Sequence, residues 1–155
     1  CLPAENRLEA VRTLARACGA DGMVGGQVLD TVYDVRDAAG LTVLNRLKTG
    51  VMISAAAELG CIASEMPATM RAQALVYADA IGRGFLDVEG DQAVFGKPIG
   101  SDVQEGKVTF VDVIGMDACR QEVAACTETA KAAVAGWPDH GFLWELADRM
   151  VGRRK

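Results

Sequence analysis

One lysine lies in the middle of an apolar helical stripe, and this stripe constrains the fold more than any other feature of the sequence. Each residue of an α-helix advances by about 100°, and one arc of about 100° then contains Leu44, Lys48, Val51, Met52, Ala55 and Leu59. The stripe predicts a helix over residues 41–59, closed by Gly60. A lysine on its buried face is costly unless the ammonium extends to solvent or meets an anion, and both explanations stay open for Lys48.

Small apolar residues and few aromatic ones favour helices that pack closely together. Half of the 155 residues are apolar, only 5% are aromatic, and much of the apolar content is alanine, which suits helices better than a β-sandwich. Further helices are predicted over residues 5–20, 66–81 and 117–135, the last with Asp117 as N-cap and Gly136 beyond its end. Another begins at Pro138, and 108–114 is a weak strand signal. The sequence predicts one all-α domain over residues 1–155.

Three glycines, Gly22, Gly25 and Gly26, lie within five residues. Each weakens a free helix by about 1 kcal/mol relative to alanine. The segment 21–30 is therefore either a loop or a helix whose backbone is closely approached by another group. Residues 31–40 are predicted to form a polar connector that ends at Gly40.

Charge and cysteine content argue against several classes of function. The formal net charge is −5, so the chain has no overall positive charge that would attract nucleic acid. Five cysteines without a CxxC spacing, and the single histidine His140, argue against a zinc site, a disulfide framework and a catalytic triad. The cysteines predict small buried thiols in a reducing cytoplasm. The sequence has no run of about 18 uncharged apolar residues, which predicts a chain without a membrane span.

The segment 96–109 combines turn-forming residues with two cations, Lys97 and Lys107. A Gly-rich backbone can approach a phosphate closely, and a lysine ammonium serves as a mobile point charge beside it. The alternative for this segment is a solvated connection with two incidental lysines.

Acids near this segment offer ligands for a divalent cation. Asp87, with Asp91 or Asp102, supplies hard oxygen atoms, and Mg²⁺ prefers one or two carboxylates together with substrate phosphates. Lys48 and Thr49 add a cation and a hydroxyl. Together these elements predict a site for a magnesium-bound diphosphate.

Six separated segments follow one another in a recognisable order: 22–30 (GMVGGQVLD), 47–50 (LKTG), 77–82 (YADAIG), 86–91 (LDVEGD), 96–109 and 146–155. Together they resemble the C-terminal half of a trans-isoprenyl diphosphate synthase (polyprenyl synthetase) of the farnesyl or geranylgeranyl type. The resemblance implies an all-α bundle around a deep cavity, of the isoprenoid-synthase type, and a homodimer. It also implies a Mg²⁺-dependent reaction in which an allylic diphosphate ionises and isopentenyl diphosphate adds to the resulting cation.

The resemblance assigns roles to individual residues. Lys48 and Thr49 would contact the allylic diphosphate. Lys97 and Lys107 would contact the same group from the segment 96–109. Asp87 would be the last acid of the second aspartate-rich motif, which holds the metal.

Two departures from the family pattern predict that this chain is inactive by itself. The first aspartate-rich motif belongs to an N-terminal half that this sequence does not contain, and a stretch with a glutamine and further acids is missing between Gly82 and Leu86. The chain is then either a piece of an active enzyme or a non-catalytic relative that serves as a structural or regulatory partner of a complete synthase. Apolar stripes left uncovered predict association in both cases.

Overall fold

The computed structural model describes residues 2–84 and 108–151. In chain order the elements are α1 (Ala4–Cys18), α2 (Met23–Val32), α3 (Ala38–Asn45), the π-helical turn η1 (Arg46–Gly50), α4 (Val51–Ala63), α5 (Ala68–Arg83), α8 (Phe110–Ile114), α9 (Met116–Val134) and α10 (Gly141–Val151). The residues in these two ranges contain no strand, and the predicted all-α class is confirmed.

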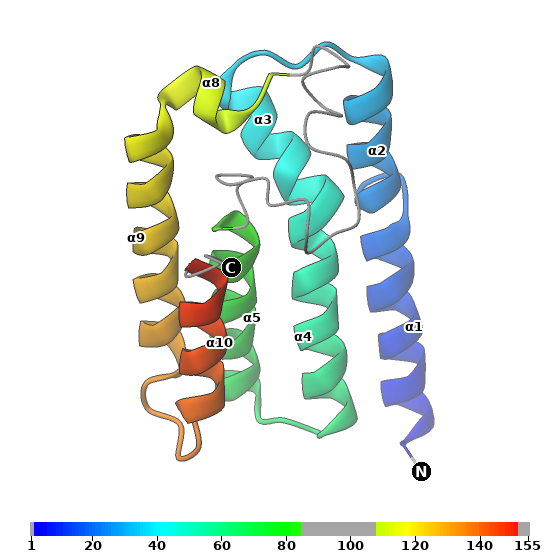
Figure 1. The fold of residues 1–155 in the computed structure, drawn as a ribbon. Helices are drawn as coiled ribbons and strands as arrows, with labels where there is room; N and C mark the ends of the chain where they lie inside the picture. Colours follow the sequence, from blue (N-terminus) through cyan, green and yellow to red (C-terminus); the bar gives the residue numbers. More distant parts are fainter. Residues whose placement is uncertain (1, 85–107, 152–155) are drawn as a thin grey trace.

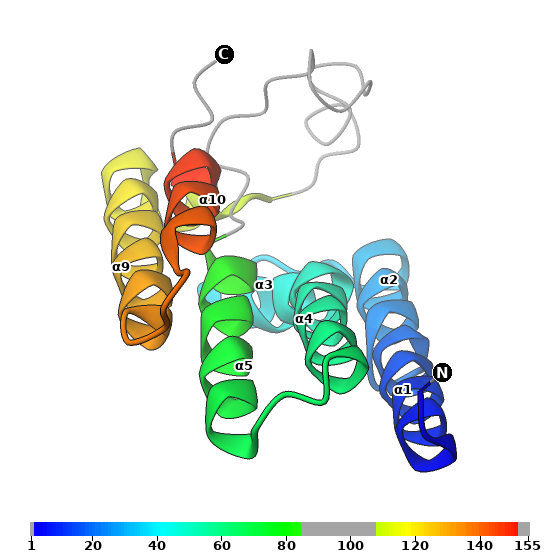
Figure 2. The same cartoon turned by 90° about the horizontal axis from the view of Figure 1, so that it is seen from below.

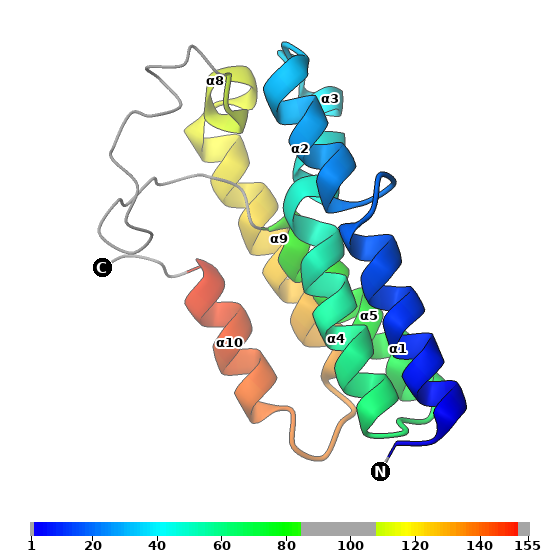
Figure 3. The same cartoon turned by 90° about the vertical axis from the view of Figure 1, so that its right-hand side faces the viewer.

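The helices form a bent row with one helix outside it. The pairs α1–α2 and α3–α4 each continue along one column, and α5 and α9 stand beside them in turn (Figure 1). Seen from below, α1 and α2 lie at one end of the row and α9 at the other (Figure 2). The side view shows α10 outside the row (Figure 3), where it packs against α9. Consequently α1 and α2 form an edge of the bundle.

The core between α5, α9 and α10 consists mainly of small side chains. Its members with no exposed surface are Ala80, Ala130, Val134 and Ala147. Tyr77 is the one aromatic residue buried in this cluster, and its hydroxyl donates a 2.8 Å hydrogen bond to the carbonyl of Leu143, which joins α5 to α10. Burial raises the pKa of the Tyr77 phenol.

The helix predicted over residues 41–59 is longer at both ends. It begins at Ala38, continues through η1 and ends at Ala63, so the prediction that Gly60 closes it is wrong. The exposed Gly60 has open space around it, and the helix continues through it, with the Gly60 carbonyl accepting a hydrogen bond from the N–H of Ser64 at 3.0 Å. At the other end the carboxylate of Asp37 accepts a 2.8 Å hydrogen bond from the N–H of Gly40, which starts α3 and shortens the predicted connector to residues 33–37.

The weak strand predicted at 108–114 is instead a short helix, α8. The backbone N–H of Thr109 donates to the carboxylate of Asp112 at 2.8 Å, and the Thr109 hydroxyl accepts from the N–H of Asp112 at 3.4 Å. This reciprocal capping satisfies N–H groups at the helix start and outweighs the strand preference of the β-branched residues. Hydrogen bonds from Thr109 also lower the pKa of Asp112.

Two helix starts differ from the prediction. Gly115, rather than Asp117, is the N-cap of α9, and its φ of 83° lies in a region that glycine adopts readily. The last helix begins at Gly141 and not at Pro138. The end of α9 at Val134 agrees with the expected stop before Gly136.

The prediction of buried thiols is confirmed at Cys61, Cys119 and Cys126, which are free, and burial raises the pKa of each thiol. None of the described helices has the length and apolar character that crossing a membrane requires.

Arg71 joins three helices far from the predicted site. Its guanidinium donates 2.6 Å hydrogen bonds to Glu9 of α1 and to Glu58 of α4. These hydrogen bonds raise the pKa of Arg71 above its ordinary value, and its side chain is only 26% exposed. Arg71 thus fixes α1 and α4 against the start of α5.

Replacing Arg71 should destabilise the bundle more than replacing an exposed paired arginine. We expect Arg71→Met to lower the free energy of unfolding by about 1–3 kcal/mol, because two carboxylates lose a charged donor. The matched control is Arg149→Met, whose guanidinium pairs with Glu145 at the surface, and there we expect a change within about 0.5 kcal/mol. Urea unfolding followed by circular dichroism measures both, and equal midpoints would contradict the role of Arg71.

Candidate functional site

The π-helical turn η1 carries two of the predicted site residues, Lys48 and Thr49. The backbone stays helical at both ends of the turn, with φ −57° and ψ −48° at Arg46 and φ −59° and ψ −43° at Gly50. Residues 38–63 therefore form one continuous helix with a single widened turn. Such turns are rare and occur often at functional sites, which makes η1 a candidate position for one.

Two glycines allow the backbones of neighbouring helices to lie directly against the backbone of η1. A Cβ on Gly26 of α2 would lie 2.4 Å from the nitrogen of Lys48, and a Cβ on Gly82 of α5 would lie 3.0 Å from the Cα of Gly50. Only a residue without a side chain fits at the first position. Of the two explanations for the glycine-rich segment 21–30, the close approach is correct, and most of the segment is helical.

The ammonium of Lys48 meets a carboxylate. Its Nζ lies 2.5 Å from Oδ2 of Asp30 on α2, one helical turn beyond Gly26. The Asp30 side chain is 13% exposed, and the Lys48 side chain is 36% exposed. The two explanations for a lysine in an apolar stripe therefore combine: an anion partners the ammonium, and the side chain keeps an open side. Thr49, the next residue, is half-buried.

The remaining predicted site residues, Asp87, Lys97 and Lys107, lie outside the described residues, and so do Asp91 and Asp102. Their assignment stays a prediction. Within residues 2–84 and 108–151, no three or more His, Cys, Asp or Glu side chains gather as they would around a metal ion. The described part of the chain therefore does not fit a magnesium site by itself.

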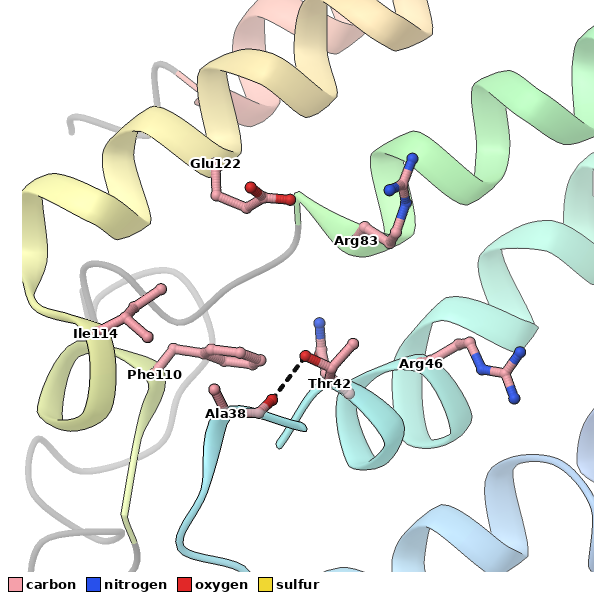
Figure 4. Close-up of a pocket in the computed structure, with 8 residues that line it drawn as sticks. Ala38, Thr42, Arg46, Arg83, Phe110, Ile114 and Glu122 are labelled. Carbon is pink, nitrogen blue, oxygen red and sulfur yellow. Dashed lines mark hydrogen bonds between the residues drawn. The ribbon is translucent and has the colours of Figure 1, made fainter. Parts of the chain in front are cut away.

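A hollow of about 180 Å³ lies near η1, where α3, α5, α8 and α9 meet (Figure 4). It is lined by Ala38, Thr42, Asn45, Arg46, Arg83, Phe110, Ile114 and Glu122. Phe110 and Ile114 give it an apolar wall, and the hydroxyl of Thr42 is already bonded to the carbonyl of Ala38 at 2.7 Å.

The charges around this hollow do not converge in it. In Figure 4 the guanidinium groups of Arg46 and Arg83 point away from Phe110, and Arg83 pairs with Asp79 at 3.1 Å. A diphosphate needs several donors aimed at one place. The geometry of this hollow therefore does not suit a diphosphate.

The sequence pattern assigns no role to Asp30, although this residue ends the segment 22–30, and it does not identify the partner of the glycine contacts. Lys48 was the only indication of such a residue in the sequence. A cation in an apolar stripe calls for an anion or for access to solvent, but the sequence alone does not locate the anion. Gly26 and Gly82 could be recognised only as glycines in helices, a position that costs stability unless a neighbour needs the space.

Comparisons with known proteins give one consistent result. A family model described as "Polyprenyl synthetase" matches residues 2–135. The farnesyl diphosphate synthase of Escherichia coli is 32% identical over 163 residues, which cover 97% of this chain and 54% of that protein. A crystal structure of a FPP/GFPP synthase from Zymomonas mobilis is 30% identical with a TM-score of 0.76, and the match covers 95% of this chain and 51% of that one.

A geranyltransferase from Helicobacter pylori, solved as a complex with magnesium and isoprenyl diphosphate, has a TM-score of 0.76 over 97% of this chain and 52% of that one. At 23% identity this likeness shows the fold alone. The chain spans about half the length of the curated relatives it matches.

The contact at Gly26 should make this glycine irreplaceable. We expect Gly26→Ala to lower the free energy of unfolding by about 1–3 kcal/mol, because the new methyl group meets main-chain atoms that belong to a helix and cannot move aside. Gly60→Ala is the matched control, since the exposed Gly60 also lies in a helix and has open space around it. That change should raise stability by about 0.4–1 kcal/mol.

Chemical unfolding of the two variants measures these opposite signs. A Gly26→Ala variant as stable as the Gly60→Ala variant would contradict the close packing of α2 on η1.

Proposed function

The chain belongs to the polyprenyl synthetase family, and we propose that it supplies the part of a trans-prenyltransferase that holds the diphosphate of an allylic substrate. The observation that carries this proposal is the Lys48 ammonium, fixed beside Asp30 on a turn that two glycine contacts position. An ammonium has three donors, so one can remain with Asp30 while the others reach phosphate oxygens.

The proposed reaction needs negative charge to be stabilised on a leaving group. The carbon–oxygen bond of the allylic diphosphate breaks, and its electron pair leaves with the diphosphate. The double bond of isopentenyl diphosphate then adds to the allylic cation, and a proton is lost. A fixed ammonium lowers the energy of the developing diphosphate charge without rearranging as the reaction proceeds. We assign this role to Lys48, with Thr49 as a neighbouring hydroxyl contact.

Other parts of the proposal rest on residues whose placement the structure does not describe. Lys97 and Lys107 are proposed as further diphosphate contacts and Asp87 as a magnesium ligand. Magnesium bound to substrate phosphates would offset the negative charge of the leaving group.

We propose that the synthase activity, and both diphosphate substrates, belong to a longer assembly of which this chain forms about half. The alternative of a non-catalytic partner stays a prediction. A cytoplasmic location is proposed from the free, buried thiols.

Binding of inorganic diphosphate tests the role of Lys48 without requiring turnover. In isothermal titration calorimetry we expect Lys48→Met to weaken binding at least about tenfold, because a charge-assisted hydrogen bond is lost. Lys131→Met is the matched control: Lys131 also pairs with an aspartate, Asp148, but lies on α9 in a different part of the bundle. Its removal should leave the affinity unchanged. Equal affinities of wild type and Lys48→Met would contradict the proposed function.

We further propose that the chain forms a homodimer through the edge made by α1 and α2. These two helices continue one another along the end of the row (Figures 1 and 2). Apolar residues on them are between 44% and 70% exposed: Leu8, Val11, Leu14, Val24, Val28 and Val32. The buried residue of α1 is the small Ala17, so its larger apolar side chains face outward. A second copy would cover this surface symmetrically, as is usual for homodimers.

Charge placed on this edge should prevent association. We expect the wild-type chain to have the mass of a dimer in size-exclusion chromatography with light scattering, and Val28→Lys to have the mass of a monomer. Val76→Lys is the control, because Val76 on α5 is 51% exposed but lies outside this edge. A monomeric wild type, or a dimeric Val28→Lys variant, would refute the proposed interface.

A further inference from the structure

The helix α2 holds Lys48 at two points. Gly26 lies against the main chain of Lys48, close enough to exclude any side chain, and Asp30 binds the ammonium at the far end of the same side chain at 2.5 Å. The two residues are four positions apart and therefore lie on one face of α2. One helix face thus fixes both the backbone and the charged tip of this lysine.

The burial of the pair is asymmetric. The carboxylate side chain is 13% exposed and the lysine side chain 36% exposed, so the open side of the pair belongs mainly to the cation. A lysine has a flexible four-carbon chain that loses much freedom when its ammonium is fixed. A carboxylate that already holds the ammonium removes part of this cost before an anion binds.

We propose that Asp30 is a positioning residue: it holds the ammonium of Lys48 so that the remaining donors face a bound diphosphate. This inference rests on the proposed function of Lys48. The opposite possibility is that Asp30 competes with the anion for the ammonium. Positioning and competition predict opposite effects of removing the charge of Asp30, which makes them separable by experiment.

The test uses the full chain and inorganic diphosphate as the probe. Asp30→Asn keeps the size of the side chain and removes its charge, and we expect it to weaken diphosphate binding about tenfold in isothermal titration calorimetry, which is the scale of one charge-assisted hydrogen bond. Asp30→Glu restores a carboxylate and should recover most of the affinity. The matched control is Asp148→Asn, which removes the aspartate paired with Lys131 and should leave binding unchanged.

A second readout follows the lysine directly. The chain has five lysines, so a sample labelled at the lysine Cε carbons gives few signals, and Lys48→Met assigns the one of interest. In Asp30→Asn we expect the Lys48 signal to shift and its relaxation to report greater mobility, while the Lys131 signal stays in place. A loss of fold would move both signals, so a change at Lys48 alone identifies a local effect.

The outcomes separate the two proposals. If wild type binds no diphosphate, or if Lys48→Met binds it as well as wild type does, the proposed function fails and the role of Asp30 fails with it. If Lys48→Met loses binding but Asp30→Asn binds equally or more tightly, only the positioning role is overturned. An unchanged Lys48 signal in Asp30→Asn overturns it as well.

Discussion

The packing of α2 against the π-helical turn is the contact on which the rest of the site depends. Because Gly26 has no side chain, the backbone of α2 reaches the backbone of Lys48, and a closely packed interior leaves no space for the two helices to slide past one another. That contact fixes the position of α2 along the helix axis. Asp30, one helical turn after Gly26, therefore lies beside the ammonium. A glycine that destabilises an isolated helix is therefore a requirement of this site.

The same logic of small residues extends to the other side of the turn. Gly82 brings α5 close to Gly50, and half of the buried residues in the core that α5 shares with α9 and α10 are alanines. Helices that meet through small side chains can approach closely, so small changes at the contacts alter the relative position of whole helices. Arg71 adds a polar tie between α1, α4 and α5 away from the turn. The turn is thus packed between α2 and α5, and further contacts elsewhere in the bundle hold α5 in place.

The sequence predicts the features that depend on neighbouring residues better than those that depend on contacts between distant residues. Helical periodicity located most of the helices, and the lysine in an apolar stripe required either solvent or an anion. Helix ends were less predictable. The helix α4 continues through Gly60 to Ala63, and Thr109 starts a helix because Asp112 completes a cap. The partner of Lys48 depends on a contact between residues 18 positions apart, and no local pattern encodes that distance.

The paired state of Lys48 also explains how the fold tolerates a cation in an apolar stripe when no anion is bound. An unpaired ammonium there would be costly, and a mostly enclosed Asp30 carboxylate that lost this cation would be costly as well. The attraction between the two charges offsets part of the cost of removing them from water during folding. Under the proposed function, a diphosphate would meet an ammonium that Asp30 already holds, so the lysine would have less to reorganise on binding. The free energy needed to place this charge would then be met during folding and not during binding, and a cation held in place in this way stabilises a leaving group most effectively.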